Sequence, residues 1–195
     1  MKHVVIFSRR PQLGRVKTRL AADIGPVKTL RFYRSTLNNT ARRVSAGGAW
    51  TTWIGITPDE TLRCCRLYPS GVRRLPQGNG DLGQRMTNCL MRFGPHPALI
   101  VGSDIPDIYQ HHIAAAFDKL RRNEMVFGPS HDGGYWLVGV AQGARSCRLF
   151  KDVRWSTKHA LADTLTNVRQ GERVAMLEHL TDIDDGATYR DWQSR

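Results

Sequence analysis

The sequence predicts an α/β fold with a mostly parallel sheet. Apolar runs of strand length alternate with segments of helical periodicity, the pattern that places helices between parallel strands. The runs at 4–7 and 98–101 contain no polar residue, as expected of strands buried on both faces. Because the 195 residues contain no internal repeat and no linker-like stretch, we expect one domain over residues 1–195.

The elements follow from apolar periodicity and from residues that start or stop helices. In order, we expect strands at 3–8, 50–56, 72–76, 98–101, 125–128, 135–141 and 173–177, and helices at 27–46, 81–93, 107–122, about 157–169 and after 181–186. The first strand is continuously apolar, and the helix after it has apolar residues at helical spacing up to Gly47 and Gly48. The second strand is rich in Thr, Trp and Ile.

Capping residues mark the remaining helix boundaries. Thr57, Pro58 and Glu60 form a capping-box start for a short helix after the second strand. Asp107 is expected to cap the helix that follows the 98–101 strand, and Ser156 or Thr157 the helix near 160. The other short strands are bounded by Gly, Pro and Asp turns, as is usual for an α/β sheet.

Charge is concentrated in the N-terminal part of the chain. Residues 1–75 hold 15 of the 29 Lys and Arg but only 3 of the 17 Asp and Glu, so they carry the whole net charge of +12. Such a basic half indicates a polyanionic partner, either nucleic acid, anionic lipid or nucleotide phosphates, or else a solvated basic face. The four cysteines form no C-x-x-C pair, and no apolar run reaches the ~20 residues of a membrane span. We therefore expect a cytoplasmic protein with reduced thiols and no membrane segment.

Asp104 is the principal candidate for a metal ligand. It follows the buried run 98–101, and Pro106 disfavours helix immediately after it. Open α/β sheets bind their ligands in the crevice beyond the strand ends, where this carboxylate would lie. Asp132 and the pair Asp182/Asp184 also follow strands or lie in Gly-rich turns, where they could join the site or merely cap turns.

Histidines offer weaker metal candidates. His131, beside Asp132, would suit Mn²⁺ or Zn²⁺ better than Mg²⁺. His111 and His112 lie at an expected helix start in a polar stretch, and we expect them at the surface.

Two stretches could bind a nucleotide. The loop after the first strand carries Arg10, Arg15, Lys17 and Arg19 around Gly14, and such a loop is suited to binding anions. It lacks the Walker A pattern, and the alternative is an exposed basic loop. Gly78–Gly83 matches G-x-G-x-x-G, with Asp104 at 21 residues further on, which would suit an NAD(P)-dependent Rossmann oxidoreductase. The strand before it is polar and contains Pro76, which is unusual for a central parallel strand.

Six motifs in order resemble a known family. They are Arg10-Pro-x-x-Gly14-x-Val-Lys17-Thr-Arg19-Leu, Gln77-Gly-x-Gly80-Asp81-Leu-Gly-x-Arg85-Met, Gly102-x-Asp104-x-Pro106, Gly128-Pro-x-x-Asp132-Gly-Gly-Tyr135, Trp155-Ser-Thr157 and Asp182-Ile-Asp184. Together they resemble the small bacterial radical-SAM/selenodomain-associated transferases of glycosyltransferase-A (GT-A) type. These belong with the nucleotide-diphospho-sugar transferases, near the guanylyltransferases of molybdenum-cofactor and 2-phospholactate metabolism.

The resemblance implies a single-domain α/β/α sandwich with the GT-A fold. It implies that a nucleoside triphosphate or nucleotide sugar binds with Mg²⁺ or Mn²⁺, the phosphates meeting the Arg10–Arg19 loop. The residues Gln77, Gly80 and Asp81 would lie against base and ribose. Asp104 would hold the metal, and Asp184 is a weaker second ligand because Asp185-Gly186 replaces the Thr-Pro usual in relatives. His131 stands where relatives commonly have an acid.

The sequence therefore predicts a metal-dependent transferase that moves a glycosyl or nucleotidyl group to a small acceptor. Asp104 and Asp132 are the predicted catalytic residues, Asp132 as a second ligand or as the base that activates the acceptor hydroxyl. Substrate contacts are expected from one further set: Tyr135, Trp155, Ser156 and Thr157. The alternatives are the Rossmann oxidoreductase and a non-enzymatic basic nucleic-acid-binding module, although the sequence has no nucleic-acid-binding signature.

Overall fold

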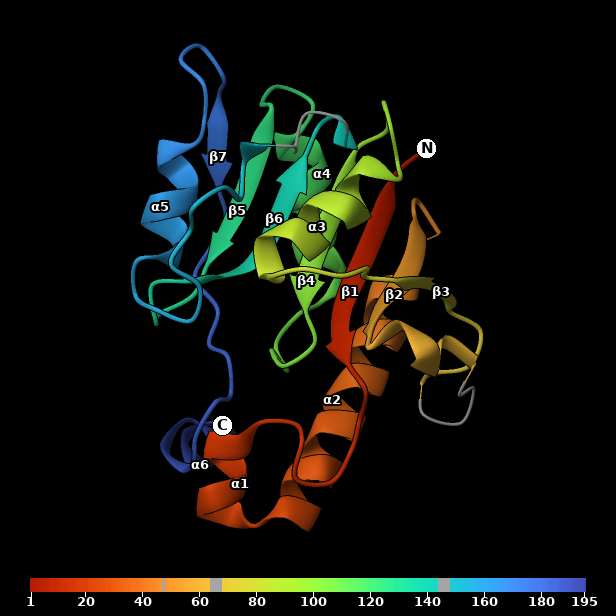
Figure 1. Ribbon diagram of the computed structural model, residues 1–195, viewed down its shortest axis with the longest axis vertical. Coiled ribbons are helices and arrows are strands. Elements are labelled where there is room, and N and C mark those ends of the chain that lie inside the picture. Colours follow the sequence, from red (N-terminus) through yellow and green to blue (C-terminus); the bar gives the residue numbers. More distant parts are fainter. Residues whose placement is uncertain (47, 64–67, 144–147) are drawn as a thin grey trace.

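The computed structural model describes residues 1–46, 48–63, 68–143 and 148–195. Within them, seven strands form one sheet in the order β3-β2-β1-β4-β6-β5-β7 (Figure 1). The strands are β1 His3–Arg9, β2 Thr51–Thr57, β3 Arg73–Pro76, β4 Ala98–Gly102, β5 Met125–Pro129, β6 Tyr135–Val140 and β7 Val174–Met176. All neighbours are parallel except β6, which runs antiparallel to β4 and β5. The predicted α/β fold with a mostly parallel sheet is confirmed.

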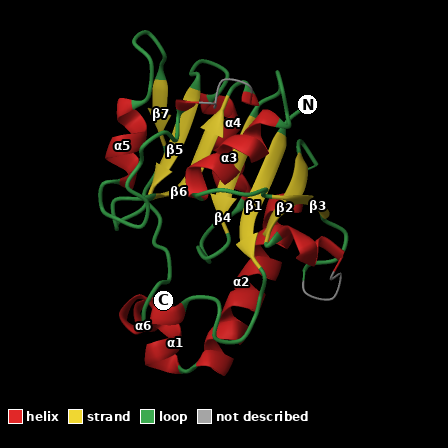
Figure 2. Cartoon of the chain, in the orientation of Figure 1, coloured by secondary structure: helices red, strands yellow, loops and turns green. Residues whose placement is uncertain are grey.

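Helices cover both faces of this sheet (Figure 2). They are α1 Thr18–Ile24, α2 Pro26–Ser45, α3 Leu82–Met91, α4 Gln110–Lys119, α5 Ala160–Thr166 and α6 Gly186–Gln193, with a 3₁₀ helix η1 at Asp59–Arg63. Because side chains alternate across a strand, Val4 and Ile6 of β1 pack with α2 and α4, whereas Val5 packs with α3. The sheet is thus buried on both faces, which explains the uninterrupted apolar runs.

The chain order creates a switch point between β1 and β4. From β1 the chain proceeds outward through β2 to β3, then returns to place β4 on the other side of β1. The two strands end at the same edge of the sheet, since Gly102, the last residue of β4, pairs with Phe7, two residues before the end of β1. In open α/β sheets the crevice beyond such strand ends is the usual ligand site.

A separate layer of helices lies beyond these strand ends (Figure 1). A small apolar cluster of its own holds this layer together: Leu20 of α1, Phe32 of α2, Tyr189 of α6, and Ile183 from the segment before α6. We expected a loop at 9–20 and no helix before residue 27, and α1 corrects that expectation. It is seven residues long and owes its place to packing against α2 and α6 rather than to an amphipathic pattern of its own.

Several helix boundaries also differ from expectation. Thr57 ends β2 instead of capping an α-helix, and a short 3₁₀ turn follows it. The helix expected from Asp107 starts at Gln110, because the His112 side chain accepts the Tyr109 N–H at 3.0 Å and caps the helix there. The helix expected from about 157 to 169 spans only Ala160–Thr166.

Two of the expectations concerned a membrane segment and the cysteines. In the part of the chain that the structure describes, no helix combines the length and the apolar character needed to cross a bilayer. Cys89 is a buried free thiol. Gly47, Cys64, Cys65 and Cys147 lie outside the described residues.

Candidate active site

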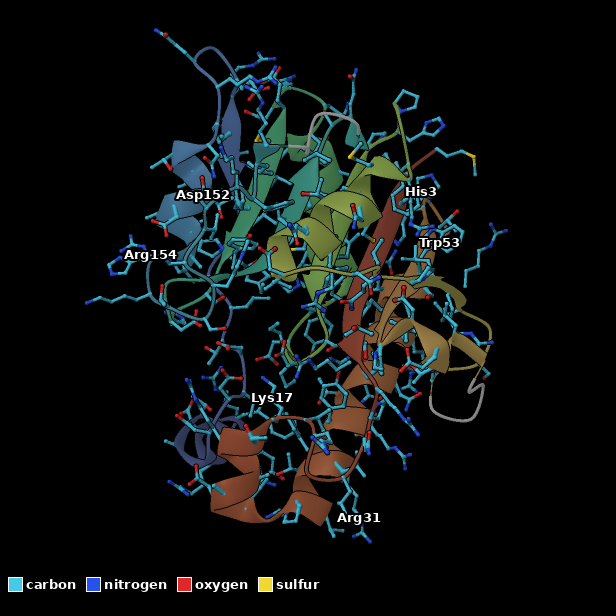
Figure 3. All side chains as sticks on the ribbon, viewed as in Figure 1. His3, Lys17, Arg31, Trp53, Asp152 and Arg154 are labelled. Atoms are coloured by element: carbon cyan, nitrogen blue, oxygen red, sulfur yellow. The ribbon has the colours of Figure 1, made fainter. Side chains whose placement is uncertain are left out.

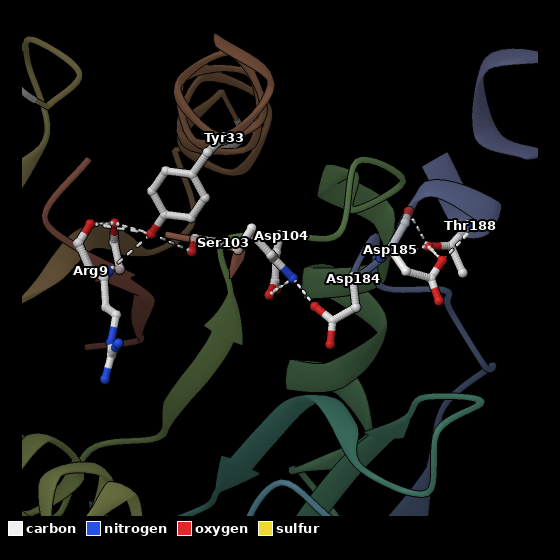
Figure 4. A network of polar contacts seen from close by, with 9 residues as sticks. Arg9, Tyr33, Ser103, Asp104, Asp184, Asp185 and Thr188 are labelled. Carbon is white, nitrogen blue, oxygen red and sulfur yellow. Dashed lines mark hydrogen bonds and ion pairs between the residues drawn. The ribbon is translucent and has the colours of Figure 1, made fainter. Parts of the chain in front are cut away.

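Asp104 is held at the switch point by a buried polar network (Figure 4). The preceding Ser103 hydroxyl lies 3.2 Å from the Tyr33 hydroxyl, which lies 3.1 Å from the Ser8 hydroxyl. The Arg9 N–H also donates to Tyr33, at 3.0 Å. Burial raises the pKa of the Tyr33 hydroxyl, so the group stays protonated and joins the ends of β1 and β4.

The Lys17 ammonium lies between two carboxylates. Its Nζ is 2.6 Å from Oδ2 of Asp104 and also contacts Oδ1 of Asp184 (Figure 4). Figure 3 places Lys17 between α1 and the strand ends, and its side chain is only 9% exposed. Burial by itself would lower the pKa of this ammonium, but Asp104 and Asp184 outweigh it and raise the pKa, so the group is charged.

Two further acids lie near this pair. Burial, followed by the charges of Asp184, Asp132 and Asp104, raises the pKa of Asp182 to about 6. Asp132 caps its own turn, since its Oδ1 accepts the Gly134 N–H at 2.9 Å. Asp132 therefore caps a turn, as one interpretation of the sequence had it. Its charge also acts on Asp182, so a role in the site is compatible with its position.

The carboxylates fit a divalent metal. Asp104 and Asp184 converge on one cationic atom, which stands where a metal ion would be ligated by both. Carboxylate oxygens are hard donors of the kind that Mg²⁺ and Mn²⁺ take alongside phosphates and water. His131 instead stacks on His179, with ring centroids 5.4 Å apart, and both side chains are exposed.

A second histidine cluster lies elsewhere in the fold. His111, His112 and Glu178 bring ligand atoms within 4.8 Å of one another. However, Nδ1 of His112 accepts the Tyr109 N–H, so Nε2 carries the proton and donates to Glu178 at 3.2 Å. Neither nitrogen of His112 then has a free lone pair. We expected both histidines at the surface, which is wrong for His112, because its side chain is buried against Trp136.

The first cavity at the strand ends is lined by cations. It has a volume of about 540 Å³ and is bordered by Arg9, Arg15, Lys17, Arg19 and Arg85, and Asp104 and Asp184 also line it. Burial and the nearby Arg9 lower the pKa of Arg85, as expected where like charges face one another. Clustered guanidinium groups of this kind bind phosphates and carboxylates.

Gln77 forms part of the wall of this cavity and is almost fully buried. Its Nε2 donates to the carbonyl oxygens of Ser8, at 3.1 Å, and Gly55, at 2.9 Å. Its Oε1 accepts from Arg85 at 2.7 Å. The amide therefore ties β1, β2 and α3 together and orients one of the cavity's cations.

The second cavity adjoins the first and is more apolar. Its volume is about 380 Å³, and it shares Asp104 and Asp184 with the first cavity. Its other lining residues include Met86, Ile100, Asp132, Tyr135, Trp136, Val138, Trp155, Ser156, Thr157 and Asp182. The Trp155 segment is fastened to α5 by a paired contact in which Arg154 donates to both oxygens of Asp163 at 2.8 Å.

The structure thus gathers most predicted site residues around two connected cavities. The residues in the lining are Lys17, Arg19, Gln77, Asp104, Asp132, Tyr135, Trp155, Ser156, Thr157 and Asp184. Four predicted residues lie outside it: Arg10, Gly14, Gly80 and Asp81. Asp81 caps α3 through the Gln84 N–H at 2.8 Å, and Gly80 adopts φ 103° where a Cβ would collide with Gln84. Their roles in nucleotide binding stay predictions.

Sequence reasoning did not select Arg9, Tyr33 or Arg85 as site residues, although all three line the first cavity. Arg85 lay within a recognised motif, which was the available signal. Nothing in the sequence marked Tyr33, which lies at an ordinary buried position of the α2 periodicity.

The Gly78–Gly83 pattern follows the edge strand β3 and does not start a Rossmann unit. A Rossmann sheet places its fingerprint after the first, central strand and is parallel throughout its nucleotide-binding half-domains. Gly83 serves packing, because a Cβ there would lie 2.7 Å from the Phe150 carbonyl oxygen and 2.9 Å from the Trp155 ring. The NAD(P) alternative thus has no structural support.

Comparison with known proteins agrees with this geometry. Residues 40–157 match the family described as "Uncharacterized protein conserved in bacteria (DUF2064)". The chain belongs to this family. It is also 26% identical over 192 residues to a 2-phospho-L-lactate guanylyltransferase from Methanopyrus kandleri, a match that covers 95% of the chain and 87% of the relative.

Solved structures relate the fold to nucleotide-diphospho-sugar transferases. A crystal structure from Desulfovibrio desulfuricans G20, provisionally described as such a transferase, matches with a TM-score of 0.86 and 25% identity, covering 94% of this chain and 82% of that one. Glucosyl-3-phosphoglycerate synthase from Mycobacterium tuberculosis, in complex with Mn²⁺ and UDP, matches with a TM-score of 0.57 at 10% identity, covering 100% of this chain and 76% of that one. The family resemblance and the GT-A-like fold are confirmed, and the chain is related to nucleotidyl- and nucleotide-sugar transferases.

Proposed function

We propose that the protein is a metal-dependent transferase that takes a nucleotide-activated donor in the first cavity and a small acceptor in the second. One observation carries this proposal: Asp104 and Asp184 converge on a single cation where the two cavities meet. A donor phosphate held by the arginines of the first cavity would then lie next to a divalent ion and an acceptor. This arrangement suits any transfer in which a diphosphate leaves.

The chain's own residues would bind and orient the reactants. Asp104 and Asp184 would hold Mg²⁺ or Mn²⁺, which supplies neutralisation of the charge that develops on the departing diphosphate. Arg9, Arg15 and Arg85 would share that charge through hydrogen bonds to phosphate oxygens. Exclusion of bulk water from this pocket would strengthen each of these interactions.

We favour nucleotidyl transfer over glycosyl transfer, with GTP as the first donor to test. The support is the guanylyltransferase relative, whose similarity extends over nearly the whole chain. An acceptor oxygen in the second cavity would bond to the α-phosphorus as the bond to the pyrophosphate breaks. Asp132, which lines that cavity, would accept the proton of the acceptor hydroxyl.

A thermal-shift screen tests the proposal. GTP, CTP, UTP, ATP and nucleotide sugars would be added with and without Mn²⁺, because a ligand that binds the folded state raises its melting temperature. We expect at least one metal-dependent shift in the wild type and its loss in Asp104→Ala. The proposal is wrong if no nucleotide shifts the wild type, or if the variant keeps the metal-dependent shift. Release of pyrophosphate rather than a nucleoside diphosphate would then distinguish nucleotidyl from glycosyl transfer.

The nucleic-acid alternative makes the opposite prediction. Binding to duplex or single-stranded nucleic acid would weaken steeply with salt and would not require a divalent metal.

A further inference from the structure

Lys17 occupies a position different from the one its motif suggests. Its place in the basic loop indicates a phosphate contact, yet its ammonium lies on the carboxylates of Asp104 and Asp184. Those same carboxylates are the proposed metal ligands. One cation therefore already occupies the carboxylate pair that a second cation must reach.

The surroundings of Lys17 are fixed independently of this ion pair. The Gly186 N–H donates to Oδ2 of Asp23 at 2.7 Å, which ties the end of α1 to the start of α6. The apolar cluster around Leu20 and Ile183 holds the same two segments together. The Lys17 side chain could thus leave Asp184 without carrying α1 away from α6.

A destination for the ammonium is also present. Lys17 lines the first cavity together with Arg9, Arg15, Arg19 and Arg85, so its flexible side chain borders both the carboxylates and the proposed phosphate position. A cation needs only to rotate about side-chain bonds to pass from one to the other.

We propose that Lys17 is an exchangeable counter-ion, which bridges Asp104 and Asp184 until a nucleotide phosphate takes up its ammonium and a divalent ion replaces it. The inference rests on the proposed function, because it takes Asp104 and Asp184 as the metal ligands. It adds that the free protein is protected from binding metal alone. Metal and nucleotide would then bind cooperatively, each removing an obstacle to the other.

Mn²⁺ binding without nucleotide gives a direct test. Free Mn²⁺ would be followed by electron paramagnetic resonance while the wild type, Lys17→Met and Lys28→Met are titrated. We expect Lys17→Met to bind Mn²⁺ at least tenfold more tightly than the wild type. Lys28→Met is the matched control, since it removes the same charge at a lysine that instead lies over the Tyr189 ring, and it should bind like the wild type. An unchanged or weaker affinity in Lys17→Met would overturn the inference.

A second arm separates exchange from a change in folding. Lys17→Arg keeps a cation on the carboxylates, so it should keep the weak Mn²⁺ binding of the wild type, and circular dichroism would report whether each variant is folded. Adding GTP should tighten Mn²⁺ binding by a larger factor in the wild type than in Lys17→Met. Equal factors would refute the transfer of the ammonium to phosphate.

Asp104→Asn distinguishes the failure of the inference from failure of the proposed function. If this variant binds Mn²⁺ as the wild type does, the metal site itself is wrong. If it loses Mn²⁺ while Lys17→Met shows no gain, only the exchange is wrong.

Discussion

Replacing Gln77 by Leu tests whether this residue is a structural support or a ligand contact. The substitution keeps the approximate size of the side chain and removes all its polar atoms. In the protein the amide makes three hydrogen bonds, to the carbonyls of Ser8 and Gly55 and from Arg85. The change would leave two carbonyls and one guanidinium without this partner in a nearly buried position.

The cost follows from these three bonds. A hydrogen bond of this kind contributes about 1 kcal/mol, so we expect a loss of about 3 kcal/mol in the free energy of unfolding. For a domain of this size, that corresponds to a fall in melting temperature of about 6–12 °C. Nucleotide affinity should fall as well, because Arg85 loses the partner that orients it in the first cavity.

Differential scanning calorimetry would measure the stability, with Gln170→Leu as the control. Gln170 is exposed, so the same substitution there should change the melting temperature little. The reasoning is refuted if Gln77→Leu keeps the wild-type melting temperature and loses only nucleotide binding. That result would mean that the amide serves the ligand, as the family resemblance implied.

Three further predictions concern packing, pH and charge. Gly83→Ala should destabilise the protein by about 1–3 kcal/mol in urea unfolding, because the new Cβ would lie 2.7 Å from the Phe150 carbonyl oxygen; wild-type stability would show that this contact relaxes freely. Asp182→Asn should stabilise the metal-free protein at pH 8 by about 1 kcal/mol, a figure that allows for solvent screening. The reason is that the pKa of the Asp182 carboxyl is raised to about 6 in the folded protein, so the charge of this carboxylate opposes folding above that pH. The gain should vanish below about pH 4, where the carboxyl is protonated in both states, and a gain that persists in acid would contradict the assignment. Finally, an excess of duplex DNA at physiological salt should leave Mn²⁺-dependent nucleotide binding unaffected in a fluorescence competition assay, whereas displacement would favour a nucleic-acid interface in the basic half.

The sheet and its long helices could be predicted because their signals are local. The apolar runs at 4–7 and 98–101 are buried on both faces, and α2 carries its periodicity over twenty residues. The helix α1 could not be predicted in this way, because it is stabilised by packing against α2 and against α6, and α6 lies at the other end of the chain. The boundaries of α4 likewise depend on the His112 cap, a choice among several polar residues that pattern alone does not make.

In the candidate site, too, some residues are marked by local sequence signals and others depend on contacts between distant parts of the chain. Asp104 could be chosen because a carboxylate directly follows a buried strand, a purely local observation. The contact between Lys17 and Asp184 joins residues 167 positions apart, and no spacing rule reveals it. Tyr33 was hidden for a different reason: an aromatic residue on a buried helix face is ordinary until its hydroxyl is found between two strand ends.

The central claim is that a nucleotide binds this site together with a divalent metal held by Asp104. Isothermal titration calorimetry, with the nucleotide that gives the largest thermal shift, tests it most directly. We predict that wild-type affinity falls at least tenfold when Mn²⁺ is replaced by EDTA, and that Asp104→Asn binds the nucleotide equally weakly in both conditions. Equal affinity of the wild type with and without metal, or an unaltered metal dependence in Asp104→Asn, would contradict the claim.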